Sequence, residues 1–346
     1  MDLTIAALLA QDGVITGAVY ALLAVGIVLV FTVTRVIFVP QGDYVAYAAL
    51  TMAAFQTGKL PGTVWLLLVL GGVALLMEFA QAWRERRWRR AGRALVFFGL
   101  MPALVAGLAA WVAPQQLHPL LYGMLTLVMV GAFGPLIYRV AYQPVAGASV
   151  LVLLIISVAV HLAITSMGLS LFGAEGSRTE PFSDLRFSVG PLQVTGQSLW
   201  VLGMTAVSIA LLFWFFSHTF RGKALKATAV NRTGAQLMGI RSTHAGMMAF
   251  ALASTIGALS GLLIAPITTI FYDTGFLIGL KGFVAAIIGG LVSYPLAAIG
   301  ALLVGLLESY SSFWASAFKE VLVFTLILPV LLWRSLRSHH SEEDEE

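Results

Sequence analysis

The feature that most constrains this chain is a succession of apolar blocks, each about 20 residues long, with almost no charged residues inside them. A helix needs about 20 predominantly apolar residues to cross the roughly 30 Å hydrocarbon core of a bilayer. Only 10% of the 346 residues are charged, whereas soluble domains carry about 25%. The sequence therefore predicts an all-α polytopic membrane protein, and it excludes a soluble enzyme, a disordered chain and a nucleic-acid-binding protein.

The blocks predict about 9–11 transmembrane helices, some of them short or broken. They lie near 13–32, 40–58, 62–81, 94–113, 120–138, 149–171, 198–217, 245–266, 275–291, 294–308 and 316–334. The blocks at 40–58, 275–291 and 294–308 are short or rich in Gly and Pro, so broken or re-entrant segments are expected there.

A single membrane domain over residues 1–346 is expected. Its parts are N-terminal spans (13–79), additional spans with an Arg-rich loop (80–120), an external loop (173–197) with a small hairpin near 187–194, a cytoplasmic segment (218–244), C-terminal spans (245–334) and an acidic tail (335–346).

Basic residues between the blocks predict the orientation in the membrane. Most of the 20 Lys and Arg residues, including the runs at 84–93 and 221–241, fall on one side if the N-terminus is outside and the C-terminus inside. Loops rich in Lys and Arg remain cytoplasmic. This orientation leaves outside only Lys59, Arg178, Arg186, Lys281 and Lys319. We therefore expect a multi-pass membrane protein with this orientation.

The cytoplasmic segment is made of good helix formers. It has no proline between Lys223 and Met238, so one helix is predicted there, with Gly239 as its C-terminal stop. At about 100° per residue, one face carries Ala227, Val230, Gly234, Leu237 and Met238, and the opposite face carries Thr228, Arg232 and Gln236. The small-residue face suits another protein with an acidic rim, or the helix rests on membrane lipid. Both interpretations stay open.

Four stretches resemble one transporter family. The first stretch covers the cytoplasmic segment and the span after it. Its motifs are Gly222-Lys-Ala, Asn231-Arg, Leu237-Met-Gly-Ile240 and Phe250-Ala-Leu-Ala-Ser-Thr-Ile-Gly-Ala-Leu-Ser-Gly-Leu-Leu263. The others are Gly17-Ala-Val-Tyr-Ala-Leu-Leu-Ala-Val-Gly26, Tyr142-Gln-Pro-Val145 with Gly147-Ala-Ser149, and Gly282-Phe-Val-Ala-Ala-Ile-Ile-Gly-Gly-Leu-Val-Ser-Tyr-Pro295 with Gly305-Leu-Leu-Glu308. Together they resemble the permeases of the high-affinity branched-chain amino acid ABC importer family.

Two motifs depart from that family. Phe38-Val-Pro-Gln-Gly42 stands where the family has Asn-Phe-Ala-His-Gly, and Ser157-Val-Ala159, followed by His161, stands where it has Thr-Leu-Gly. Residues 80–120 are additional to the family plan.

The resemblance implies a multi-pass permease subunit of the bacterial inner (plasma) membrane. Such a subunit passes branched-chain or other small neutral amino acids, or amides such as urea, inward. The resemblance also implies cytosolic ATPase subunits, a second homologous permease subunit in a heterodimer rather than a homodimer, and an external solute-binding protein as partners. It assigns contact with the ATPase to Lys223, Ala227, Val230, Asn231, Gly234, Leu237, Met238 and Gly239. ATP is expected on the partners, so no cofactor or metal of the chain's own is expected.

Two breaks in the apolar pattern predict the transport pathway. The first consists of Gln41, Gly42 and Asp43, the second of Gly289, Gly290 and Ser293, and Ser157 completes the predicted set. Paired breaks in the two halves of a transporter indicate a pathway, although two tight turns between helices account for them equally well. Snorkelling at span ends is the favoured explanation of Glu78, Lys319 and Glu320, and packing that of His161.

No catalytic motif is present, neither a phosphate-binding loop nor a zinc-protease or serine-hydrolase signature. An enzyme is therefore not expected, and an intramembrane enzyme is disfavoured. An ion-coupled secondary transporter of small solutes is the alternative. It needs a buried carboxylate relay, which only Asp43 and Glu308 could begin.

Overall fold

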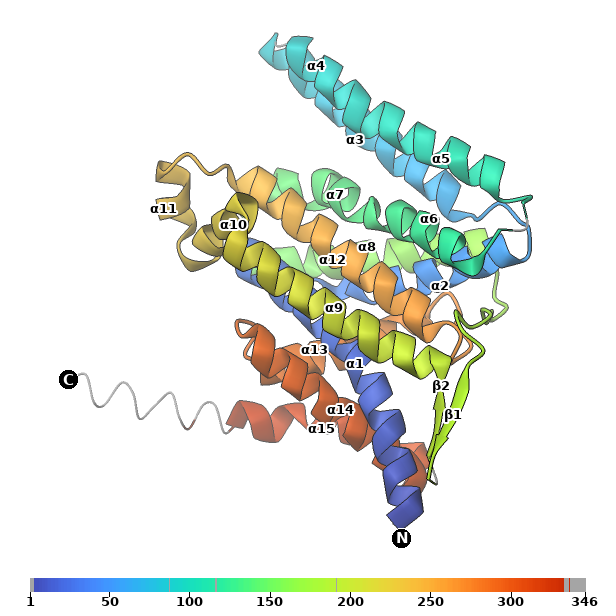
Figure 1. The fold of residues 1–346 in the computed structure, drawn as a ribbon. Helices are drawn as coiled ribbons and strands as arrows, with labels where there is room; N and C mark the ends of the chain where they lie inside the picture. The colour runs from blue at the N-terminus through green and yellow to red at the C-terminus, as the bar shows by residue number, and fades with distance from the viewer. Residues whose placement is uncertain (1–2, 87, 116, 191, 333–335, 337–346) are drawn as a thin grey trace, which may run out of the picture.

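The structure is a computed structural model that describes residues 3–86, 88–115, 117–190, 192–332 and 336. It is a bundle of helices with one β-hairpin (Figure 1). The helices are α1 (Leu3–Thr34), α2 (Asp43–Gln56), α3 (Thr63–Glu85), α4 (Trp88–Ala94), α5 (Met101–Val112), α6 (Pro119–Gly131), α7 (Phe133–Ile137), α8 (Val150–Phe172), α9 (Gly196–His218), α10 (Phe220–Val230), α11 (Arg232–Leu237), α12 (Ser242–Ile264), α13 (Thr274–Ile288), α14 (Tyr294–Trp314) and α15 (Lys319–Thr325).

Shorter elements connect these helices. The 3₁₀ and π segments are η1 (Val39–Gln41), η2 (Leu95–Leu100), η3 (Tyr138–Tyr142), η4 (Gln143–Val145) and η5 (Ser316–Phe318). Strands β1 (Arg186–Val189) and β2 (Leu192–Thr195) pair antiparallel, so the hairpin expected near 187–194 is present. The acidic tail predicted over 335–346 lies outside the described residues apart from position 336.

Eight helices in the described part of the chain are long and apolar enough to cross a membrane. This finding confirms the prediction of an all-α polytopic membrane protein. The helices α2, with 14 residues, and α13, with 15 residues, are shorter. They cover only about 21–23 Å, as expected for the blocks at 40–58 and 275–291. The block at 294–308 is not short, because Pro295 lies in the first turn of a 21-residue helix, α14, where proline is tolerated.

Helix α1 lies at the centre of the bundle. Its apolar window is 83% buried, and its glycines bring α14 close. A Cβ at Gly17 would lie 2.9 Å from the Leu302 Cα, and one at Gly13 would lie 2.8 Å from the Leu306 Cα. Small residues four positions apart allow helix backbones to approach in a membrane. The sequence similarity at 17–26 therefore covers a helix–helix contact that organises the fold.

Helices α3 to α5 form a hairpin at one side of the bundle (Figure 1), and its second arm lies in residues 80–120, which are predicted to be additional. We call α3 to α5 the additional hairpin. α3 leads in, and α4, η2 and α5 return alongside it as one continuous span, with only 17% of its window buried. A Cβ at Gly71 of α3 would lie 2.7 Å from the Phe98 oxygen, so the two arms are in close contact. Most of the α5 surface is thus left to lipid.

The polar segments gather at opposite ends of the bundle. Figure 1 places α4, α10 and α11 at one end and the hairpin β1–β2 at the other. An isolated bridge between Ser177 and Ile270 ties the 173–197 loop to the connection between α12 and α13. This separation of basic segments from the hairpin is what the predicted orientation requires, and the direction in the membrane stays a prediction.

Candidate functional site

The break after Pro40 is a single 3₁₀ turn between the end of α1 and α2. Gln41 is fully buried, and its Nε2 donates a hydrogen bond to the Ala253 oxygen of α12 at 2.9 Å. The same side chain packs on Gly26 of α1, where an added Cβ would lie 2.7 Å from Gln41 Nε2. Gln41 therefore fixes the turn between α1 and α12.

Gly42 brings this turn into backbone contact with α13. A Cβ at Gly42 would lie 2.8 Å from the Gly279 Cα, and one at Gly275 would lie 2.9 Å from the Gly42 carbonyl carbon. A larger residue would force α2 and α13 apart, because close backbone approach in membranes depends on small residues. Helix packing thus explains this glycine.

Asp43 begins α2 and faces α8. Its two carboxylate oxygens lie 2.9 and 3.0 Å from His161 Nδ1, and both side chains are buried. The His161 ring stacks on Phe276 of α13, with 4.5 Å between ring centroids. Ionisable groups within membrane segments are costly and are usually paired. His161, expected to be a packing residue, is therefore also the partner of Asp43 and joins α2, α8 and α13.

Ser157 lies one helical turn before His161 on α8. Its hydroxyl is buried and lies 2.9 Å from the hydroxyl of Tyr142, at the end of η3. Asp43, through His161, thereby contacts the same face of α8 that carries Ser157. We call Asp43, Tyr142, Ser157 and His161 the polar site.

An aromatic cluster lies beside the polar site and shares Tyr142 with it. Its members are Phe38, Tyr44, Tyr142 and Phe250, each at most 2% exposed. The Phe38 ring centroid lies 5.7 Å from that of Tyr44, 5.8 Å from that of Tyr142 and 4.8 Å from that of Phe250. The Tyr44 hydroxyl is buried with no hydrogen-bond partner in the described part of the chain. The four rings are closely packed, and the cluster contains one unsatisfied polar group, the Tyr44 hydroxyl.

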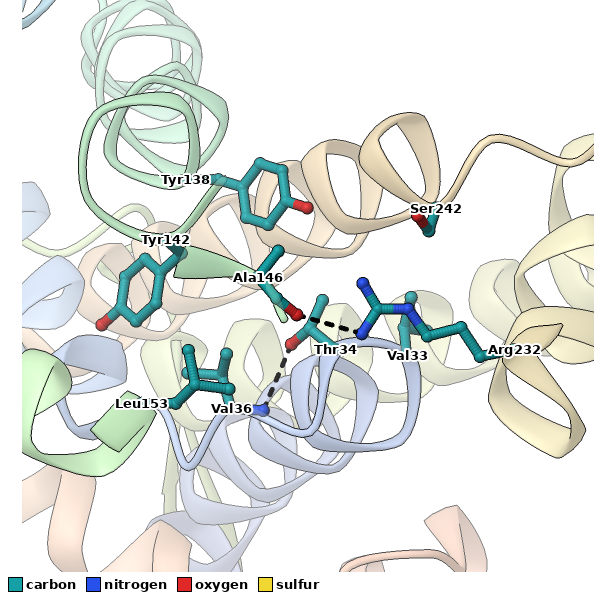
Figure 2. A pocket seen from close by; sticks show the side chains of 9 residues that line it. All are labelled: Val33, Thr34, Val36, Tyr138, Tyr142, Ala146, Leu153, Arg232 and Ser242. Atoms are coloured by element: carbon teal, nitrogen blue, oxygen red, sulfur yellow. Dashed lines mark hydrogen bonds between the residues drawn. The ribbon is translucent and has the colours of Figure 1, made fainter. Parts of the chain in front are cut away.

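A narrow pocket lies on the other side of Tyr142, at the end of the bundle that carries α11 (Figure 2). It is lined by Val33, Thr34, Val36, Tyr138, Tyr142, Ala146, Leu153, Arg232 and Ser242. Arg232 of α11 points into the pocket, and its Nη1 donates a hydrogen bond to the Ala146 oxygen at 3.3 Å. The pocket is therefore where α11 touches the connection between η3 and α8.

The second predicted break is the turn between α13 and α14. Gly289 ends α13, Gly290 has a φ of +67° and Leu291 has a φ of +59°. The Ser293 hydroxyl accepts a hydrogen bond from the Leu296 N–H and so caps α14. Along α13 this turn lies about 15 Å from the contact between Gly279 and Gly42. The structure therefore does not bring the two breaks together, and turn geometry explains the second.

Lys281 lies within α13, inside the block predicted over 275–291, and not in an outside loop as the predicted orientation required. It is buried, with its Nζ 2.5 Å from a Glu308 oxygen and 3.2 Å from a Glu320 oxygen. The Tyr20 hydroxyl of α1 donates to the other Glu308 oxygen at 2.6 Å. Glu320, expected to snorkel at a span end, instead helps to neutralise Lys281. The sequence signal for this network was the presence of opposite charges, Lys281, Glu308 and Glu320, inside apolar blocks, because such charges are usually paired.

Glu78 also differs from the expectation of snorkelling. It is buried in α3 and lies 2.6 Å from the Nε of Arg139, which the orientation argument placed in a loop and the structure buries in η3. Gln81 accepts a second hydrogen bond from Arg139 at 3.3 Å. This ion pair ties the additional hairpin to the rest of the bundle.

The carboxylate relay required by the alternative transport mechanism is not continuous. Asp43 pairs with His161 and Glu308 pairs with Lys281. Within the described residues no hydrogen bond joins the two pairs, and no group of three His, Asp or Glu side chains is arranged for a metal ion.

The predicted single helix over 223–238 is wrong, because the chain breaks at Asn231. Asn231 has extended backbone angles, and its Oδ1 accepts a hydrogen bond from the Gly234 N–H at 2.8 Å. Asparagine side chains compete for backbone groups in this way, so they favour the N-cap over a helix interior. The segment consists of α10, which carries Lys223, Ala227 and Val230, followed by α11.

The common face calculated for one straight helix is therefore lost. Gly234 lies in the first turn of α11, where an added Cβ would be 3.2 Å from the Asn231 side chain. Gly239, with a φ of +84°, follows the end of α11 as predicted.

Three large apolar side chains of this segment nevertheless lie in the open. Val230 is 86% exposed, Leu237 84% and Met238 83%. The basic side chains of Arg221, Lys223, Lys226 and Arg241, in or next to the same segment, are exposed as well. Exposed apolar groups of this size gathered on a polar segment indicate an interaction surface. We call Val230, Leu237 and Met238 the docking surface.

Comparison with known proteins identifies similar chains over most of the length. A family model described as "Branched-chain amino acid transport system / permease component" matches residues 9–331. The chain is 27% identical to the "High-affinity branched-chain amino acid transport system permease protein LivH" of Escherichia coli (strain K12), with 93% of this chain and 91% of that protein covered. It is 24% identical to the corresponding protein BraD of Pseudomonas aeruginosa, with 93% and 92% covered. No solved structure matches this chain.

Proposed function

The chain belongs to the family of permease components of branched-chain amino acid transport systems, and from this premise we propose that it is the permease subunit of an ABC importer that carries branched-chain amino acids inward. It is a multi-pass inner-membrane protein. Other small neutral amino acids, and amides such as urea, are proposed as further substrates.

The observation that carries the coupling to ATP is the docking surface. An 84% exposed Leu237 beside an 83% exposed Met238, at the basic end of the bundle, calls for an apolar partner with an acidic rim. We propose that cytosolic ATPase subunits bind there and hold the ATP, so that the permease itself needs no cofactor. The remaining proposed contacts lie on α10, on α11 or at the ends of α11. They are Lys223, Ala227, Asn231, Gly234 and Gly239.

Further partners are proposed for the opposite end of the bundle and for its lipid-facing helices. The hairpin β1–β2 lies at the end away from α11 and is the proposed contact for an external solute-binding protein. A second, homologous permease subunit is proposed to complete the transmembrane unit, with lipid around both.

The polar site is the part of the proposed pathway that the geometry supports best. Asp43 and Ser157 offer charge and hydroxyl groups inside the bundle, and such groups in membrane proteins mark transport routes. Gln41 and Gly42 hold α1, α12 and α13 around this point. Gly289, Gly290 and Ser293 were predicted as a second lining element, and the turn that they form lies apart from the polar site.

The docking surface can be tested by co-purification with the proposed ATPase subunits, co-expressed with this chain. The double substitution Leu237→Glu with Met238→Glu is expected to abolish co-purification, because it places two like charges where an apolar contact and an acidic rim are proposed. The double substitution Leu185→Glu with Phe187→Glu, at two exposed apolar positions near the hairpin β1–β2, is the matched control and should retain the ATPase.

Membrane lipid is the competing occupant of the docking surface. If the double glutamate variant keeps its ATPase, but α10 and α11 become more accessible to proteases in vesicles, the surface binds lipid and the proposed coupling is wrong.

A further inference from the structure

The turn of the additional hairpin carries the densest positive charge in the chain. Residues 84–93 contain six arginines, no lysine and a single acid, Glu85. The Gln81 Nε2 donates a hydrogen bond to the Glu85 Oε1 at 2.9 Å. Clusters of four to eight basic residues directly beside a membrane-spanning helix are typical of segments that bind acidic lipid headgroups.

Arg84, Arg86 and Arg93 present exposed side chains at this turn. Arg86 caps the end of α3 with left-handed backbone angles, at a φ of +52°, and the chain then returns as α4. Ala91 and Ala94 of α4 are buried, so Arg93 lies on the exposed side of this helix. Within the described residues no carboxylate forms an ion pair with any of these three arginines. We call Arg84, Arg86 and Arg93 the arginine cluster.

Exposed tryptophans indicate the depth of this turn in the bilayer. Trp65 and Trp83 of α3 are both exposed, and the 18 positions between them correspond to about 27 Å of helix. On the returning arm the exposed Trp111 also lies 18 positions after Arg93. Tryptophan is enriched at both membrane interfaces, and the hydrocarbon core between them is about 30 Å thick. Trp83 and the arginine cluster therefore lie at the headgroups of one leaflet, and Trp65 and Trp111 at those of the other.

Apolar side chains facing lipid follow directly after the arginine cluster. Leu95, Phe97 and Leu100 of η2 are all exposed, within about two helical turns of Arg93. A phospholipid molecule can thus place its acyl chains along η2 and α5 while its phosphate group reaches the cluster. The surface matches both ends of such a molecule.

The choice of arginine over lysine at this turn also fits a phosphate ligand. A guanidinium group is planar and donates two parallel hydrogen bonds to phosphate oxygens, whereas the lysine ammonium acts as a point charge. Lysine and arginine both retain a loop in the cytoplasm, and the segment 221–241 contains both. Exclusive use of arginine at 84–93 is therefore not required by the orientation in the membrane.

We propose that the arginine cluster binds the phosphate headgroups of acidic phospholipids, and that this binding holds the turn of the additional hairpin at the membrane interface. The inference goes beyond the proposed function. It concerns residues outside the docking surface and the polar site, and it does not depend on which solute is carried or on the ATPase.

Native mass spectrometry of the full-length chain, released from detergent, can measure this binding. Bound lipid molecules are counted while dioleoylphosphatidylglycerol, which is acidic, or dioleoylphosphatidylcholine, which is zwitterionic, is added. The unsubstituted chain is expected to bind the acidic lipid more tightly. The triple substitution Arg84→Gln, Arg86→Gln and Arg93→Gln should weaken binding of the acidic lipid at least about tenfold, since one basic side chain near an acidic lipid surface contributes about fivefold. Binding of the zwitterionic lipid should persist, which shows that the variant is folded.

The matched control removes the same charge at the same end of the bundle. Arg221→Gln, Lys226→Gln and Arg241→Gln together change three exposed positions in or next to α10 and α11, and they should leave binding of the acidic lipid intact. Lysine at all three positions of the arginine cluster should restore part of the affinity, because the charge returns without the planar donors.

Two results would overturn the inference. Equal losses in the two triple glutamine variants would show a diffuse attraction of lipid to the whole basic end of the bundle. Unchanged binding of the acidic lipid after substitution of the arginine cluster would leave these arginines with a role in orientation alone.

Discussion

Asp43 and His161 form a buried pair, with 2.9 Å between the Asp43 Oδ2 and the His161 Nδ1, although 118 positions separate them in the chain. The pair joins the first turn of a short helix to the middle of a long one. Stacking of His161 on Phe276 adds a third helix to the contact. One polar interaction therefore fixes the relative positions of α2, α8 and α13.

Breaking this pair should destabilise the protein markedly. Asp43→Asn removes the carboxylate beside the buried imidazole, and a hydrogen bond to a charged group contributes about 1.5–3 kcal/mol. We expect a clearly lower apparent melting temperature in detergent, measured by the loss of the monodisperse peak in size-exclusion chromatography after heating. Asp273→Asn, at an exposed position in the connection before α13, is the control. Equal melting temperatures for the two variants would contradict a stabilising role.

The pair of Glu78 and Arg139 should hold the additional hairpin on the bundle. Glu78→Gln removes the negative charge 2.6 Å from Arg139 Nε, and a loss of about 3 kcal/mol would raise the local opening of α3 roughly 100-fold. Hydrogen exchange with mass spectrometry should show faster exchange in α3, whereas α1 and α12 should be little affected. Glu175→Gln, in an exposed loop, should leave exchange in α3 unchanged, and the same result in Glu78→Gln would refute this account.

Close approach of α1 and α14 depends on Gly17. Gly17→Leu would place its Cβ 2.9 Å from the Leu302 Cα, and overpacking of a filled site costs about 1–3 kcal/mol. We expect a lower yield of folded protein and a lower melting temperature. Gly72→Leu is the matched control, because an added Cβ at Gly72 of α3 meets no atom within 4 Å. A Gly17→Leu variant as stable as Gly72→Leu would show that this contact tolerates a wider spacing.

The orientation can be measured directly in a chain with no cysteine of its own. Arg84→Cys and Asp184→Cys place single thiols at exposed positions near opposite ends of the bundle. In intact cells a membrane-impermeant maleimide is expected to label position 184 and to spare position 84, because basic segments remain cytoplasmic. Labelling at position 84 alone would reverse the orientation assigned to the chain.

Sequence reasoning predicted the helical class well, because bilayer thickness fixes the length of an apolar block whatever the partners of its residues. It also located the short helices α2 and α13, since glycine and proline interrupt the apolar pattern locally. It placed Lys281 inside the block at 275–291 but counted it among the outside basic residues, and it did not identify the partners of this side chain. These partners, Glu308 and Glu320, lie 27 and 39 positions away, and a single sequence does not reveal such pairings.

The candidate site shows the same division between local features, which the sequence predicts, and contacts between distant residues, which it does not. Asp43 and Ser157 were identified from their polarity within apolar blocks, but the contacts of Asp43 with His161 and of Ser157 with Tyr142 depend on tertiary packing. The helix break at Asn231 is local and was still missed. The average helix propensity of its neighbours outweighed the capping preference of one side chain, whereas in the structure that side chain binds the Gly234 N–H.

The short helix α2 has a consequence for how the protein is made. Its 14 residues begin with an aspartate, so it is too short and too polar at its start to enter the bilayer as a stable span by itself. The long, apolar α1 can insert as soon as it leaves the ribosome, whereas Asp43 has to wait until more than a hundred further residues have been synthesised and α8 supplies His161. During biogenesis the nascent chain therefore passes through a stage with an unneutralised carboxylate next to the lipid, and that stage is where insertases and membrane proteases would recognise an incomplete molecule.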